Sequence, residues 1–144
     1  VDDTLNSVPI TTGIFDIALQ SDGKILVGGN FTSYGNTSSN YLIRLKSDGT
    51  FDDTFMIGSG AGSSVNKIAG RPNGKIVVAG YFTTFNGVTK SRIVQLNDDG
   101  TTDDSFVGSI SQSLLDLKVE TAGSLLIAGN NGRVEWLNED GSAN

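Results

Sequence analysis

The 144-residue sequence contains no cysteine and no histidine, and both absences narrow the chemistry open to it. Without cysteine there are no disulfides, no thiolate nucleophiles and no zinc–thiolate or iron–sulfur sites. Without histidine, the commonest general base and the commonest transition-metal ligand are also missing. Most familiar enzyme mechanisms are therefore excluded, and we expect neither a cofactor nor enzymatic activity.

Basic residues are few and long apolar runs are lacking. Ten Lys and Arg residues are scattered singly among 16 acidic residues, which gives a net charge of −6. Such a charge argues against a surface for nucleic acid or anionic lipid. Because no apolar run approaches the roughly 18 residues of a membrane span, membrane insertion is not expected either.

Turn-forming residues are abundant in place of helix formers. Gly, Ser, Thr and Asn account for 60 residues, and 13 of the acidic residues are Asp while only 3 are Glu. Aspartate suits turns, whereas glutamate favours helices. This composition predicts an all-β protein.

An internal repeat with a period of about 51 residues determines the predicted architecture. Residues 17–55 align without a gap on residues 68–106, with 16 of 39 positions identical. A third copy begins at Leu114 and is eight residues shorter, and residues 1–5 resemble the closing piece of a repeat. We therefore predict one repeat domain over 1–144, with blades at 14–57 and 65–108, a shortened blade at 114–141 without its closing piece, and a spare closing strand at 1–5.

Each full repeat alternates β-branched runs with turn signals, which predicts a four-stranded antiparallel unit. The segments around Asp22-Gly23 and Asn73-Gly74 are predicted to be type I′ hairpin turns. The middle runs at 25–27 and 76–78 are apolar throughout and are expected to be buried on both faces. Units of this kind stack as a β-propeller or a β-solenoid, and four strands per unit favour the propeller, here with about three blades.

The same residues resemble a known family. Asp-Gly-Lys-Ile-Leu-Val-Gly-Gly-Asn-Phe at 22–31, followed by Ser-Asp-Gly-Thr and Asp-Asp-Thr-Phe at 47–55, is similar to the delta-60 repeat of bacterial surface proteins and phage virion proteins. The resemblance implies a propeller in an extracellular, virion or bacterial cell-surface setting. It implies no catalytic residue.

Recurring carboxylates are the first candidates for a site. Asp48, Asp52 and Asp53 are repeated in the second copy as Asp98, Asp99, Asp103 and Asp104, and oxygen ligands of this kind suit Ca²⁺. The EF-hand pattern is excluded, since Phe55 and Phe106 stand where it requires Glu. Two consecutive turns explain the acids more simply than a metal site or a glycosidase pair, although an irregular calcium loop stays open. We expect no metal site and no catalytic residue.

Two longer loops are candidates for ligand binding, because the third repeat replaces them with Asn131-Gly132. Their Asn, Thr and aromatic groups would suit sugar hydroxyls and rings. The alternative is an ordinary variable loop whose aromatic residues pack inward. The predicted ligand-binding residues are Tyr34, Asn36, Thr37, Asn40, Phe85, Asn86 and Lys90.

Three blades are too few to close a propeller, which usually has about 4 to 8. Trp136 occupies the repeat position of Arg44 and Gln95 and is predicted to cover an end of the stack or meet another chain. The sequence therefore predicts a homo-oligomer or larger assembly, for example a head-to-tail pair forming six blades, with an interface at Val1, Asp2, Asp3, Thr4, Leu5 and Trp136.

These observations support three functional hypotheses. The first is a non-enzymatic structural or adhesive propeller module of a phage virion, as in a tail or fibre, or of a bacterial surface protein. The second is a lectin-like propeller that binds a surface glycan, and the third, less supported, is a propeller glycoside hydrolase.

Overall fold

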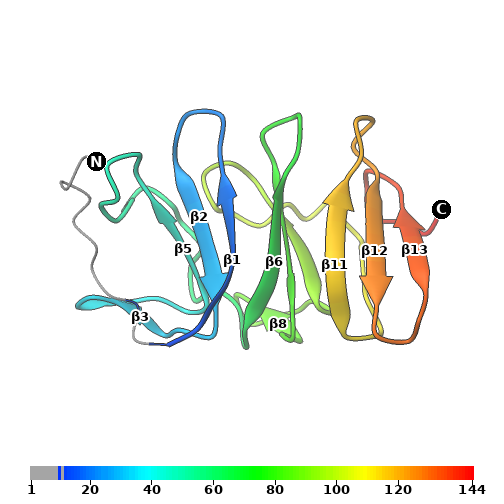
Figure 1. The fold of residues 1–144 in the computed structure, drawn as a ribbon, viewed down its shortest axis with the longest axis horizontal. Coiled ribbons are helices and arrows are strands. Elements are labelled where there is room, and N and C mark those ends of the chain that lie inside the picture. The colour runs from blue at the N-terminus through cyan, green and yellow to red at the C-terminus, as the bar shows by residue number, and fades with distance from the viewer. Residues whose placement is uncertain (1–9, 11) are drawn as a thin grey trace.

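The computed structural model describes residues 10 and 12–144, and these residues form an all-β propeller fold (Figure 1). Three three-stranded antiparallel sheets follow one another along the chain, accompanied by two short hairpins. The predicted closing strand at Val1, Asp2, Asp3, Thr4 and Leu5 lies outside the described residues. Within the described part of the chain, no helix has the length and apolarity needed to cross a membrane.

Each sheet is one blade of the propeller. Blade 1 contains β1 (Ile14–Leu19), β2 (Ile25–Gly29) and β5 (Leu42–Leu45); blade 2 contains β6 (Val65–Gly70), β7 (Ile76–Gly80) and β10 (Ile93–Leu96); blade 3 contains β11 (Leu114–Val119), β12 (Leu125–Gly129) and β13 (Val134–Leu137). The hairpins are β3 (Ser33–Tyr34) with β4 (Thr37–Ser38), and β8 (Thr84–Phe85) with β9 (Val88–Thr89).

The middle strand of each blade pairs with both of its neighbours, and its apolar residues are the most deeply buried. All five residues of β7 are buried, as the continuous apolar run predicted. A register shift occurs at the same repeat position in every blade, after Ile14, Val65 and Leu114. The repeat in the sequence is therefore also a repeat in strand register.

The tight hairpin turns differ from the predicted type I′ geometry. Gly23, Gly74 and Gly132 have positive φ angles of 85°, 81° and 75°, but the residues before them do not. Type I′ needs positive φ at both central residues, whereas a type I turn followed by a left-handed glycine needs it at one. Asp and Asn thus keep their favoured negative φ, and glycine alone takes the left-handed conformation.

The predicted fourth strand is reduced to a single bridging residue in each blade. Isolated bridges join Leu45 to Phe51, Leu96 to Thr102 and Leu137 to Ala143. Pairing ends there in blade 1 because Asp52 at once caps a new turn. In blade 3 the equivalent bridge forms at Ala143, the first position of the closing piece.

Apolar layers join the blades. One core cluster lies between blades 1 and 2, and a second lies between blades 2 and 3. The first strands β1, β6 and β11 are neighbours in space, with β6 between the other two (Figure 1). The blades are thus held together by side-chain packing between separate sheets, and the two ends of the row are far apart.

Candidate functional site

The predicted ligand-binding loops are compact hairpins on one edge of the blades. The β3–β4 and β8–β9 hairpins both lie at the lower edge of the view in Figure 1. Each is a two-residue ladder, pairing Ser33 with Ser38 and Thr84 with Thr89. Of the predicted binding residues, Tyr34, Thr37 and Phe85 therefore lie on these short ladders.

The two aromatic residues of these hairpins point inward. Tyr34 stacks on Phe51 with ring centroids 6.3 Å apart, and its hydroxyl donates to the Gly49 carbonyl at 3.0 Å. Phe85 packs edge-on against Phe82 at 5.9 Å within the layer between blades 1 and 2. Both rings are buried, so the inward-packing alternative describes them, and the expectation that they offer a face to a sugar needs correction.

Two of the predicted asparagines hold the connection between blades 1 and 2. Asn40 donates from its amide to the Ser59 carbonyl at 2.6 Å. Asn86, at a positive φ of 53°, accepts a hydrogen bond from the Gly60 N–H at 3.0 Å. These side chains are half-buried and already bonded to the backbone, which explains them structurally without a ligand.

The remaining predicted residues offer free polar surface. Asn36 and Thr37 are exposed at the tip of the first hairpin, and Lys90 is half-buried after the second. A shallow hollow beside the first hairpin is lined by Tyr34, Gly35, Asn36, Thr37, Gly49, Thr50 and Phe51. The structure thus brings Tyr34, Asn36 and Thr37 together and leaves Phe85, Asn86 and Lys90 on the neighbouring blade.

Four of the recurring aspartates, Asp48, Asp52, Asp99 and Asp103, cap turns as predicted. Asp48 accepts hydrogen bonds from the N–H and the hydroxyl of Thr50, at 2.9 and 2.7 Å. The same pair of contacts, from a carboxylate to the second residue after it, recurs at Asp52, Asp99, Asp103 and Asp140. These hydrogen bonds lower the pKa of Asp48, Asp99 and Asp140 below the ordinary value.

One capping aspartate in blade 1 also forms a buried ion pair. Asp52 is 1% exposed and accepts from Nε of Arg44, which is 2% exposed, at 2.7 Å. Burial alone would raise the pKa of Asp52, but hydrogen bonds from Thr54 and Arg44 outweigh it and lower the pKa to about 2. At neutral pH this carboxylate therefore stays ionised, and both of its oxygens accept hydrogen bonds.

The equivalent buried aspartate of blade 2 is bonded by different residues. Asp103 accepts from Gln95, which occupies the repeat position of Arg44, and from Nζ of Lys75, both at 2.6 Å. Burial alone would raise the pKa of Asp103, but the hydrogen bonds from Lys75, Ser105 and Gln95 outweigh it and hold the pKa well below its usual range.

Two guanidinium groups cross the joints between blades, and sequence reasoning missed both. Arg44 donates to the Asp98 carbonyl and lies over the Phe55 ring at 4.5 Å. At the next joint, Arg71 donates to the Glu139 carbonyl at 2.8 Å and lies 5.6 Å from Phe106. Because the two arginines come from different repeat positions, a comparison of aligned positions could not reveal their shared role.

A further hollow lies where three first hairpins meet. Its lining includes Gln20, Arg71 and Glu120, which are equivalent positions in the three blades. The charges are mixed, and no group of three or more acidic residues in the described part of the chain is placed to hold a metal ion.

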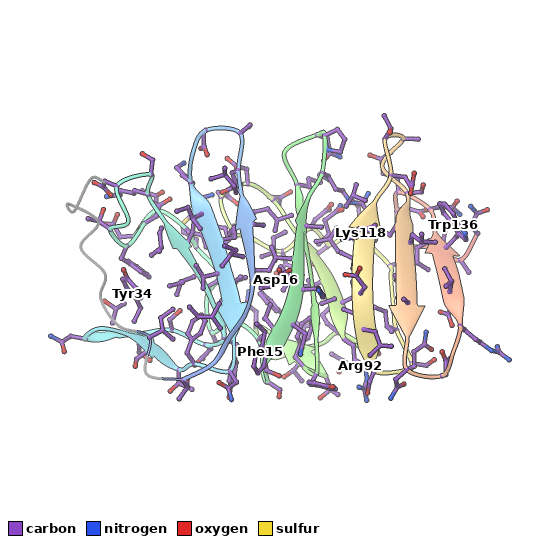
Figure 2. All side chains as sticks on the ribbon, in the orientation of Figure 1. Phe15, Asp16, Tyr34, Arg92, Lys118 and Trp136 are labelled. Atoms are coloured by element: carbon purple, nitrogen blue, oxygen red, sulfur yellow. The ribbon has the colours of Figure 1, made fainter. Side chains whose placement is uncertain are left out.

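Trp136 lies at the opposite end of the row from Tyr34, on β13 (Figure 2). It pairs with Leu126, as Arg44 pairs with Leu26, so its predicted repeat position is confirmed. Its indole is exposed.

The blade repeat defines the chain as a β-propeller-repeat protein. A family model described as "domain of unknown function (DUF5122) beta-propeller" matches residues 20–55 and 71–106, together half of the chain. The chain belongs to this family. A search of the curated proteins found no match.

Proposed function

We propose that the chain is a non-enzymatic β-propeller module with a structural or adhesive role on a phage virion or bacterial surface. The observation that carries the proposal is the use of the buried carboxylates. Asp52 and Asp103 are bonded to a cation and to the turn that each caps. We therefore assign both carboxylates a structural role in the blades.

The pKa pattern supports a scaffold over a hydrolase. A glycosidase acid needs a raised pKa so that it is protonated near neutral pH. In the described residues, every aspartate whose pKa departs from the ordinary value is lowered, namely Asp22, Asp48, Asp52, Asp99, Asp103, Asp116 and Asp140. The virion or surface setting rests on the resemblance of the repeat to delta-60 repeats.

A second candidate, glycan binding, is favoured by the hollow at the first hairpin. Asn36 and Thr37 are exposed, and their amide and hydroxyl groups line this hollow together with Tyr34 and Phe51. Hydrogen-bonding groups next to apolar surface are what a sugar site uses. Blade 2 offers a matched comparison, because Val88 stands at the position of Thr37 and cannot hydrogen-bond through its side chain.

A glycan array combined with a broad glycosidase screen tests both candidates. The scaffold role predicts no turnover, and turnover of any glycoside would refute it. The glycan-binding role predicts specific binding that is lost in Thr37→Ala and kept in Val88→Ala. Binding that both variants retain would place the ligand elsewhere.

A further inference from the structure

The two inner joints, between blades 1 and 2 and between blades 2 and 3, show which side chains a blade-to-blade contact buries. Val65 and Ile68 of β6 pack onto blade 1, where a Cβ added at Gly28 would lie 3.2 Å from the Val65 Cβ. Leu114 and Leu117 occupy the same repeat positions at the second joint. All four are buried. We call the surface that these positions form on a blade its leading face, and the surface that receives them its trailing face.

Blade 1 carries the same leading positions, and no other blade among residues 12–144 packs on them. Ile14 and Ile17 align with Val65 and Ile68, yet they are 51% and 64% exposed. Val27 on the same face is buried, so the uncovered part is the strip along β1. Apolar side chains at positions that are buried in both other blades mark a contact surface.

The trailing face of blade 3 is also uncovered. Val134 aligns with Ile93, which is fully buried, but is itself 62% exposed. Trp136 is 45% exposed at the position of the buried Arg44 and Gln95. An aromatic residue thus replaces the polar or charged group of the inner joints, and exposed Trp is a frequent anchor of protein interfaces.

We infer that two copies of this chain pack head to tail, the leading face of blade 1 on the trailing face of blade 3, and close into a six-bladed ring. The inner joints show that leading and trailing faces of this repeat fit one another. Each copy carries one of each face, so two copies form two identical joints. Six blades lie within the usual range of about 4 to 8. A head-to-tail contact forms a closed ring when the rotation from one copy to the next brings the last free face back to the first.

The joint predicts a specific residue pair. Ala128 occupies the repeat position of Gly28, and Ile14 that of Val65. Because a Cβ added at Gly28 would lie 3.2 Å from the Val65 Cβ, we expect the Cβ atoms of Ala128 and Ile14 to be in contact across the joint between the two copies. A disulfide needs Cβ atoms about 3.5–4.5 Å apart. Because the chain has no native cysteine, the variant Ile14→Cys/Ala128→Cys reports this contact without background.

The expected result is a dimer that forms under mild oxidation and separates on reduction. The control Ile14→Cys/Val88→Cys places the second thiol on the exposed β9 hairpin, away from both faces, and is expected to remain monomeric on the gel. Equal cross-linking of both variants, or none in the first, would overturn the inference.

Light scattering on the unmodified chain at about 100 μM supplies a second readout. The expected mass is twice 15.1 kDa. Ile17→Asp and Val134→Asp, each at an exposed position, should weaken dimerisation at least about tenfold, while Val88→Asp leaves it unchanged and circular dichroism confirms that all variants fold. A monomer at this concentration, or polymers that grow with concentration, would contradict the closed ring.

Discussion

Replacing Arg44 with methionine isolates the contribution of the guanidinium that holds blade 1 to blade 2. Methionine keeps the length and apolar body of the side chain but removes every donor. Asp52 then remains buried with the Thr54 contacts and no cation. The neighbouring carbonyl of Asp98 and the ring of Phe55 also lose their partner.

The structure sets the size of the expected loss. Removing one partner of a buried ion pair typically costs about 3–5 kcal/mol, and both groups here are almost fully buried. Arg44→Gln should cost less, about 1–2 kcal/mol, because a hydrogen bond to a charged group is retained. Blade 2 uses that arrangement naturally, with Gln95 donating to Asp103.

Urea denaturation at pH 7, followed by circular dichroism, measures these differences in the free energy of unfolding. The double variant Arg44→Met/Asp52→Asn is the control. Its neutral amide still accepts from Thr54, so it should recover at least about 1 kcal/mol relative to Arg44→Met. A loss below about 1 kcal/mol in Arg44→Met, or no recovery in the double variant, would refute the role assigned to the pair.

Three further predictions concern acid, metal ions and glycine. The pKa of Asp52 is about 2 in the folded chain against an ordinary 3.8. The free energy of unfolding should therefore stay constant above about pH 4 and fall between pH 4 and 2, by on the order of 2 kcal/mol for this group. A free energy of unfolding that does not change down to pH 2 would contradict this. The turn-capping role of Asp52 and Asp103 predicts that EDTA lowers the melting temperature by less than about 10 °C in a thermal scan, and a larger fall would point to bound metal. Gly74→Ala should lower the free energy of unfolding by about 1 kcal/mol because of its positive φ alone. Gly100→Ala, also at positive φ, would place a Cβ 2.9 Å from the Met56 nitrogen across the joint and should cost about 1–3 kcal/mol more. Equal urea midpoints for the two variants would show that the backbone at this joint shifts to accommodate the added Cβ.

The sequence was sufficient where the physics is local or periodic. Asp48 and Thr50 lie two residues apart, so their hydrogen bonds depend on the turn they share and could be predicted from the spacing. The repeat likewise predicted the middle strands, because an apolar run without alternation must be covered on both faces. Ile17 and Val134 are equally visible as repeat positions, but the sequence alone does not show that they are uncovered.

Contacts between residues far apart in the chain required the tertiary structure. Tyr34 and Phe85 could have faced a ligand or the core, and the layers beside blade 1 bury them. Arg44 and Arg71 reach carbonyls of the next blade from different repeat positions, and no local pattern encodes such a match. The reason is physical: a turn is set by neighbouring residues, whereas a joint is set by which side chains meet when two sheets pack.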